Sequence, residues 1–317
     1  MKPLADSLVV KGFEIVFTAR RFSITIQVCR MLGLPVVEIG GSPATRSKLR
    51  KSLASFSRAA ALVRHFSGSR PALALSHGSR SQVIAARLMG VTCVCLDDYE
   101  YSDQSLVPLM NALIVPQAIP AITWGRHSSK VLHYPGIKEN IYLHGWKLPD
   151  HLPARQAIIL LRPEGTTAHY YSEKSTRLLS GTIDFLASSG DVHVRLVPRS
   201  ARQSMELKQR MESAGLSCSV LEQIIPGPDL VWSSDLVIGG GGTMTREAAA
   251  LGVRSYSFFS GRWGAVDRSL ESAGRLVGIR EPADLDKLVI KPEKRVPPVI
   301  GPESRDSVLG HLMAIVG

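Results

Sequence analysis

A glycine-rich turn is the part of this sequence best suited to binding an anion. Residues 236–238 are a short apolar run typical of a buried parallel strand, and glycines fill positions 239–242. Thr243 can cap the helix predicted over residues 245–251, which Gly252 ends. Because glycine has no Cβ atom, a phosphate can approach this backbone closely, and the helix's first N–H groups and positive dipole end attract it.

Glu247 extends this interpretation from a phosphate to a nucleotide. We expect it in the first turn of the helix, where its carboxylate can accept hydrogen bonds from ribose hydroxyls. The glycine spacing fits neither the dinucleotide fingerprint nor a P-loop, since no Gly-Lys-Ser/Thr follows. The alternative is a strand that simply turns tightly into a helix, with Glu247 facing the dipole. Ordering four consecutive glycines on folding costs more backbone entropy than ordering a turn of other residues. This extra cost favours a binding role for the glycines.

Other candidate side chains follow strands elsewhere in the chain. His77 ends a predicted strand and suits an acid or base near neutral pH, although it could instead cap the next helix. Asp98 and Glu100 lie in a loop after the next strand. They are candidates for acceptor recognition or for the general base, or belong to a solvated loop. Arg199, also after a strand, is a candidate phosphate contact.

For some polar residues a structural role competes with binding. His169, Tyr170 and Tyr171 could stack on a base or a sugar, or they could pack against the protein. Asp267 could contact a sugar hydroxyl, but capping the helix that follows is the favoured role.

Strands and helices alternate along the chain, which predicts right-handed crossovers and parallel sheets. Prolines between residues 147 and 155 mark a hinge. We expect an α/β fold with Rossmann-like domains at 1–147 and 148–317 that face a cleft, the final helix returning to the first domain. The predicted strands are 13–17, 36–39, 72–75, 91–96, 112–115, 157–161, 193–197, 217–221, 236–238 and 255–258. The main predicted helices are 24–32, 44–66, 81–89, 173–188, 204–214, 245–251 and 304–314.

The chain opens in an unusual way for an α/β domain. Residues 3–12 resemble the end of an amphipathic helix closed by Gly12, whereas such a domain normally opens with a strand. We therefore expect the true start to lie upstream. The first domain's sheet would then lack its first strand, with an empty position beside the strand predicted at 13–17.

The charge balance points to an anionic partner. The 317 residues carry a net charge of +11. The chain lacks the aromatic–basic runs and the zinc-finger spacing of nucleic-acid binders, so no nucleic acid is expected. The basic helix at 44–66 is either a solvated face or a contact with an acidic membrane surface. With neither a membrane-spanning run nor an export signal, the sequence predicts a cytoplasmic protein, with or without peripheral attachment to the membrane's inner face.

The four cysteines are Cys29, Cys93, Cys95 and Cys218. No histidine-rich cluster accompanies them, so we expect reduced thiols and no metal site.

Several motifs together resemble a known family. They are Gly-Gly-Gly-Gly-Thr-Met-Thr-Arg-Glu at 239–247, Ser-His-Gly at 76–78, Tyr-Pro-Gly at 134–136 and Gly-Ala-Val-Asp at 264–267. They resemble, in order and over essentially the whole chain, the archaeal and bacterial family called domain of unknown function 354. That family is similar to the two-domain glycosyltransferase B fold, which includes the transferase that makes lipid II and the UDP-N-acetylglucosamine 2-epimerases.

The resemblance implies roles for particular residues. It makes the second domain the nucleotide-sugar-binding domain and the first the acceptor side. It places the diphosphate at Gly240, Gly241, Gly242 and Thr243, and the ribose at Glu247. The resemblance also implies that Arg162 lies close to the diphosphate and balances its negative charge.

The chain departs from the family pattern in two places. The strand and histidine-containing loop that usually open the family are lacking here. The epimerases carry an acid soon after the His-Gly pair, where this chain has Ser79, although the Asp-Asp-Tyr-Glu loop at 97–100 matches their later acidic loop.

The favoured function is transfer of a sugar from a nucleoside diphosphate donor to a lipid or glycan acceptor. His77, or an acid from Asp98 and Glu100, would deprotonate the acceptor. The donor is a substrate, and no other cofactor is expected. A nucleotide-sugar 2-epimerase and a non-catalytic nucleotide-sugar-binding protein are the alternatives.

Overall fold

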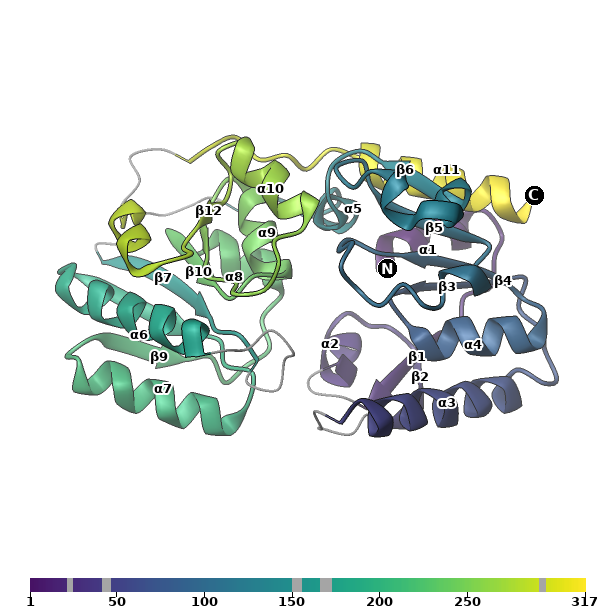
Figure 1. Cartoon of the computed structure of the whole chain (residues 1–317), viewed down its shortest axis with the longest axis horizontal. Helices are drawn as coiled ribbons and strands as arrows, with labels where there is room; N and C mark the ends of the chain where they lie inside the picture. The colour runs from purple at the N-terminus through teal and green to yellow at the C-terminus, as the bar shows by residue number, and fades with distance from the viewer. Residues whose placement is uncertain (22–24, 42–46, 150–155, 166–172, 291–294) are drawn as a thin grey trace. The chain divides into compact units, whose positions relative to one another are not determined.

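The computed structural model describes residues 1–21, 25–41, 47–149, 156–165, 173–290 and 295–317 (Figure 1). The chain forms two compact units. The first comprises Met1–His144, Gly264–Val266 and Gly301–Gly317, and the second comprises Gly145–Trp263 and Asp267–Ile300. The predicted hinge falls largely on residues 150–155, which lie outside the described residues.

The first unit alternates helices with parallel strands. Its elements in chain order are α1 (Lys2–Val10), β1 (Phe17–Arg21), α2 (Thr25–Met31), β2 (Val36–Gly41), α3 (Lys48–His65), β3 (Leu73–His77), α4 (Arg80–Met89), β4 (Thr92–Leu96), η1 (Val107–Leu109), β5 (Ala112–Pro116), η2 (Ala121–Lys130), β6 (Val131–Tyr134), α5 (Lys138–Leu143) and α11 (Glu303–Val316). The strand β6 and the helix α5 were not among the elements expected from the sequence.

The strands of the first unit form two parallel sheets. One contains β1 and β2, and the other has the order β3-β4-β5-β6. Within the described residues β1 does not pair with β3. The strands β4 and β5 are almost wholly buried, whereas β1 and β3 are partly exposed. The buried Arg58 of α3 links β2 to α4, since its Nε donates to Ile39 O at 2.9 Å and its Nη1 to Ser81 Oγ at 2.8 Å.

The first predicted strand was placed too early. Pairing begins at Phe17, opposite Val36, and not at Phe13. Gly12 has φ +88° and turns the chain out of α1, and the Phe13 N–H then bonds to Leu8 O at 3.1 Å. Phe13 and Ile15 pack against the apolar cluster around α1 instead of joining a ladder.

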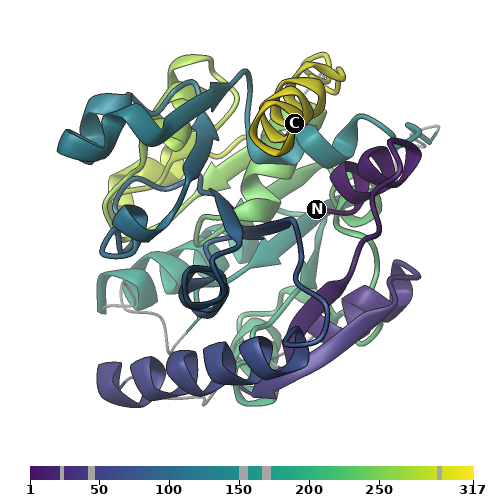
Figure 2. The same cartoon turned by 90° about the vertical axis from the view of Figure 1, so that its right-hand side faces the viewer.

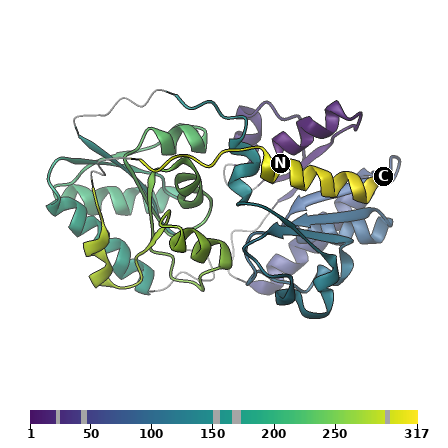
Figure 3. The same ribbon diagram turned by 90° about the horizontal axis from the view of Figure 1, so that it is seen from above.

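The core of the first unit joins distant parts of the sequence. Leu4 of α1 and Ile114 of β5 share a buried cluster with Val308 and Leu312 of α11. Figure 3 shows α1 in purple and α11 in yellow side by side. The helix α3 lies at the outer edge of this unit in both Figure 1 and Figure 2, packed against α4 and β2.

The second unit is built on one six-stranded parallel sheet of order β12-β11-β10-β7-β8-β9. Its elements are β7 (Ala157–Arg162), α6 (Glu173–Ser188), β8 (Val192–Leu196), α7 (Ala201–Ser213), β9 (Ser217–Val220), α8 (Gly227–Trp232), β10 (Leu236–Gly239), α9 (Thr243–Leu251), β11 (Arg254–Ser257), α10 (Ala265–Ser272, which begins in the first unit), β12 (Val277–Gly278) and η3 (Pro282–Lys287). The glycine strand β10 is central and pairs with β7, so Gly239 lies opposite Arg162 at the carboxyl edge, where parallel sheets bind ligands.

Candidate functional site

The glycine turn connects β10 to α9, and the helix starts earlier than the sequence predicts. Gly242 is the residue before the helix, and Thr243 is its first residue, so the expected Thr243 cap is wrong. Gly241 and Gly242 have φ of +81° and +91°, values that favour glycine. The Thr245 hydroxyl donates to Gly242 O at 2.9 Å. Because the helix begins early, Glu247 lies in its second turn and not in its first.

Close packing explains most of the glycines in this turn. A Cβ atom on Gly240 would lie 2.1 Å from Glu164 Cγ, and one on Gly241 would lie 3.0 Å from Phe259 Cβ. A Cβ on Gly239 would lie 3.2 Å from Arg162 O. At Gly242, by contrast, a Cβ would meet no atom within 4 Å. The turn is therefore packed tightly at its start and open where the N–H groups of α9 begin, which suits an anion there.

Glu164 is a member of this site that sequence analysis missed. It is buried, and its carboxylate accepts hydrogen bonds from Ser175 Oγ at 2.6 Å and from Ser260 N at 2.9 Å. Burial raises the pKa of this carboxyl. The available signal was an acid two residues beyond the end of β7, at the same sheet edge as the glycines. Glu164 ties the start of α6 and the loop after β11 to the glycine turn.

The two expected phosphate-binding arginines lie at the carboxyl ends of neighbouring strands, Arg162 as the last residue of β7 and Arg199 in the loop after β8. Arg162 Nη1 donates to Val197 O and Pro198 O, both at 3.0 Å, so it also supports the loop after β8. Burial, together with the nearby charge of Arg199, lowers the pKa of Arg162 to about 10. Arg199 is exposed, and its Nε donates to Pro163 O at 3.3 Å. Two cations close enough to repel each other favour a bound anion.

Glu247 and its neighbour Arg246 are both buried. The Glu247 side chain is 6% exposed, and a Cβ on Gly227 would lie 2.7 Å from its Oε2. Its carboxylate therefore lies against the first turn of α8. Arg246 pairs with Asp267, which lies inside the first turn of α10. The expectation that Asp267 caps α10 is wrong, because its carboxylate accepts from Arg246.

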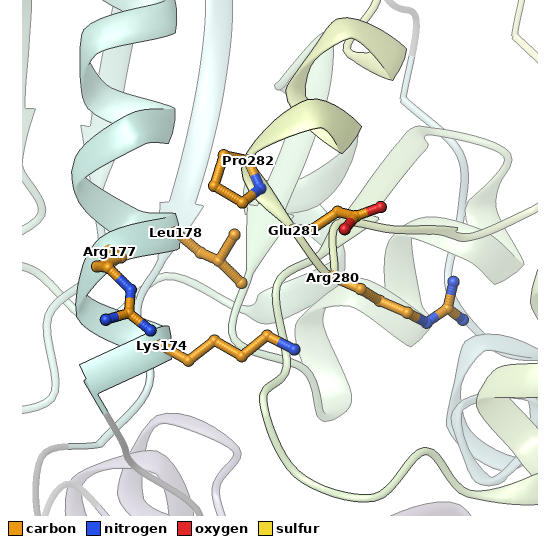
Figure 4. A pocket seen from close by; sticks show the side chains of 6 residues that line it. All are labelled: Lys174, Arg177, Leu178, Arg280, Glu281 and Pro282. Atoms are coloured by element: carbon orange, nitrogen blue, oxygen red, sulfur yellow. The ribbon is translucent and has the colours of Figure 1, made fainter.

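An open pocket of about 380 Å³ lies between the start of α6 and the segment after β12 (Figure 4). Lys174 and Arg177 project from α6 on one wall, and both are exposed. On the other wall, Arg280 stacks on Trp263 at 4.3 Å and pairs with Glu271 at 2.6 Å. The remaining residues that line the pocket are Leu178, Glu281 and Pro282.

This pocket adjoins the glycine turn through a short chain of contacts. Ser175, next to Lys174 in α6, bonds to Glu164, and Glu164 packs against Gly240. The start of α6, which forms one wall of the pocket, is therefore linked to the glycine turn through Glu164. The aromatic candidates His169, Tyr170 and Tyr171 lie outside the described residues.

In the first unit, His77 and Asp98 meet at the carboxyl ends of neighbouring strands. His77 Nε2 lies 3.4 Å from Asp98 Oδ1, and Lys138 Nζ bonds to Asp98 Oδ2. The Asp98 side chain is nearly buried, whereas that of His77 is 36% exposed. Asp97 shapes the loop, because its Oδ1 accepts from the Asp98 and Tyr99 N–H groups. The pair can orient an exposed imidazole for proton transfer.

Lys138 was not predicted, although it follows the Tyr-Pro-Gly motif at 134–136. Glu100, which was predicted, is buried in the first unit. Its Oε1 accepts from Ala265 N at 2.7 Å. Glu100 thus holds a backbone N–H group at the start of α10, a different role from that of the Asp98 carboxylate.

Two units of alternating strands and helices, each built on parallel sheets, define a two-domain α/β protein. The chain belongs to the family described as protein of unknown function (DUF354), whose model matches residues 4–295. No curated protein sequence matches the chain.

Solved structures share the fold at low sequence identity. S. aureus MnaA with UDP has a TM-score of 0.73 at 13% identity, over 98% of this chain and 92% of that one. The Methanocaldococcus jannaschii UDP-GlcNAc 2-epimerase, in complex with UDP-GlcNAc and UDP, has a TM-score of 0.72 at 13% identity, over 98% and 95%. For Acinetobacter baumannii MurG the TM-score is 0.56 at 14% identity, over 98% and 94%. These likenesses establish the glycosyltransferase B-like fold.

The described residues also bear on membrane insertion and on metal binding. No helix among them is both long and apolar enough to cross a membrane. Nor do these residues include a group of three or more His, Cys, Asp or Glu side chains placed to hold a metal ion. Their cysteines are free thiols, and burial raises the pKa of Cys93 to about 12.

Proposed function

We propose that the chain binds a nucleoside diphosphate sugar in its second unit and transfers the sugar to a hydroxyl group of a lipid or glycan acceptor. The observation that carries this proposal is the turn before α9. It is packed against Glu164 and Phe259 but open at Gly242, where α9 begins, and the first N–H groups of a helix have no partner within the helix. Solved structures of the same fold that contain UDP or UDP-GlcNAc support a nucleotide ligand.

The negative charge of a nucleoside diphosphate matches the positive groups at the carboxyl edge of the second unit's sheet. A diphosphate at Gly242 and Thr243 would accept hydrogen bonds from backbone N–H groups at the positive end of α9. Arg199, exposed and beside Arg162, would supply a further positive charge. Glu247 would bind the ribose, and the pocket bounded by Lys174 and Arg177 would accept another part of the donor. The proposal needs no resident cofactor, since backbone and arginines meet the diphosphate charge.

The first unit would supply the base. His77 would take the proton from an acceptor hydroxyl while that oxygen bonds to the sugar's anomeric carbon. The bond from this carbon to the diphosphate oxygen would break, and the nucleoside diphosphate would leave with the electron pair. Asp98 would stabilise the imidazolium that forms, as an adjacent carboxylate does. Donors at the turn would stabilise the leaving diphosphate.

The same first-unit cluster also suits an epimerase, the second candidate. His77, Asp98 and Lys138 place an imidazole, a carboxylate and an ammonium group in contact. Such groups can remove a proton from carbon and return one to the opposite face of the sugar. Epimerisation would give an isomeric sugar nucleotide without any acceptor, so product analysis separates it from transfer.

A direct test combines binding with turnover. UDP and a set of UDP-, GDP- and dTDP-sugars are titrated by calorimetry and then incubated with the protein, with and without lipid and glycan acceptors. We expect nucleotide binding, and release of nucleoside diphosphate only with an acceptor. His77→Asn is the matched variant: it should keep nucleotide affinity and lose about 10²–10⁴-fold in turnover. Binding without any turnover would leave a nucleotide-sugar-binding protein, and the absence of nucleotide binding would refute the proposal.

A further inference from the structure

The helix α3 is apolar on two opposite faces. Its inner face packs into the first unit, where Ala59 and Leu62 are buried against Ile39. Its outer face carries Leu49, which is 70% exposed, Leu53, which is 59% exposed, and Phe56, which is 60% exposed. A helix at the surface of a water-soluble unit normally carries polar residues on its outer side. We call these three residues the apolar stripe.

The spacing of the stripe places it along one side of the helix. Positions 49, 53 and 56 follow the i, i+4, i+7 pattern, and the exposed Ala60 continues it. Large apolar side chains grouped in this way, rather than scattered singly, mark an interaction surface. Figure 1 and Figure 2 place α3 at the outer edge of the first unit.

The charges on α3 indicate what that partner is. The helix contains no Asp or Glu. Arg50 and Arg64 are exposed on the flank of the stripe, at about 100° and 60° around the axis from Leu49. The acid of the adjacent strand β2, Glu38, is paired with Arg21 and Arg30. An apolar stripe beside cations on a surface helix is the arrangement that enters the boundary between anionic headgroups and acyl chains.

We propose that the outer face of α3 binds membranes that contain anionic lipids. The apolar stripe enters the upper acyl region, and Arg50 and Arg64 contact the headgroups. This surface is separate from the nucleotide site of the second unit, so the proposal does not depend on the proposed function. It would bring a protein without a described membrane-spanning helix to a lipid surface.

The test uses the full chain and vesicles of phosphatidylcholine with or without phosphatidylglycerol, separated by flotation. We expect wild type to bind only the vesicles with phosphatidylglycerol, and high salt to weaken binding. The variant Leu53→Ser/Phe56→Ser should lose binding. The matched control Ile122→Ser/Met205→Ser removes side chains that are 78% and 69% exposed elsewhere and should bind like wild type. Circular dichroism and urea unfolding check that each variant is folded.

Arg50→Gln/Arg64→Gln provides a second arm that leaves the apolar stripe intact. It should bind anionic vesicles about thirtyfold more weakly, as expected for loss of two surface cations. Equal binding by wild type and both α3 variants, or no binding by wild type at low salt, would overturn the proposal. Sedimentation supplies a further test: concentration-dependent dimers that Leu53→Ser/Phe56→Ser abolishes would show that the stripe joins two copies instead.

Discussion

Arg246 of α9 and Asp267 of α10 form a buried, two-bond ion pair. Arg246 Nε donates to Asp267 Oδ1 at 2.8 Å, and Nη2 donates to Oδ2 at 2.9 Å. Both side chains are nearly inaccessible to solvent. The pair fixes α10 against α9, the helix that begins at the glycine turn. It therefore helps to hold in place the helix whose N-terminus forms the candidate phosphate site.

Replacing Arg246 with Met should destabilise the protein strongly. The change leaves the Asp267 carboxylate buried without its cation, which typically costs about 3–5 kcal/mol. Urea unfolding measures the loss. The control is Arg202→Met, which removes an exposed partner of Glu206 on α7 and should change stability little. Similar midpoints for the two variants would contradict a structural role for the buried pair.

Alanine at two positions of the turn should separate packing from binding. In Gly240→Ala the new Cβ collides with Glu164, so we expect a loss of about 1–3 kcal/mol in unfolding free energy. In Gly242→Ala the Cβ meets no atom but occupies the open side of the turn. Its positive φ adds strain of about 1–2 kcal/mol. The midpoint temperature of thermal unfolding should therefore fall further for Gly240→Ala than for Gly242→Ala. Relative to the stability lost, the affinity for UDP should fall further for Gly242→Ala. The reverse order would place the anion elsewhere.

Glu247→Gln tests whether this carboxylate serves the ligand or the fold. Gln keeps the shape and one acceptor oxygen, so UDP should bind about tenfold more weakly if ribose hydroxyls use the charge. Calorimetry compares the variant with wild type, and urea unfolding is measured alongside. If stability falls while affinity stays unchanged, Glu247 acts by holding α8 against α9 near Gly227.

The raised pKa of Glu164 predicts a pH-dependent stability difference. Because the folded protein favours the protonated carboxyl, Glu164 contributes most to stability below its ordinary pKa. That contribution is lost as pH rises through the raised, folded-state value. The stability of Glu164→Gln relative to wild type should therefore increase with pH over this window and then level off. Urea unfolding at a series of pH values checks it, and a constant difference would show that the carboxyl does not titrate in the folded state.

Local sequence patterns were enough to predict much of the second unit. The helix at 173–188 has the expected bounds, and β7 and β10 lie within one residue of the predictions, because their apolar patterns agree with their burial. The site's centre was also visible in the sequence, since the glycines follow a buried strand. The first strand was misplaced because residues 13–17 are apolar enough for a strand but pack against α1.

Contacts between distant residues could not be predicted in the same way. Lys138 reaches Asp98 only because β4, β5 and β6 pair in that order, and the sequence carries no direct sign of that order. Glu164 likewise gains its role from Ser175 and Ser260, which come from two other segments. Arg162 followed the expected strand, but its bonds to Val197 O and Pro198 O depend on the neighbouring loop.

The position of α11 has a consequence for the order of events during synthesis. Val308 and Leu312 complete a core whose other members precede residue 145, whereas the second unit is complete in sequence by Ile300. The chain therefore makes every residue of the second unit before it makes the helix that completes the core of the first. Until α11 has been made, Leu4 and Ile114 lack their final packing partners, so the first unit cannot complete its core before the sequence of the second unit is finished.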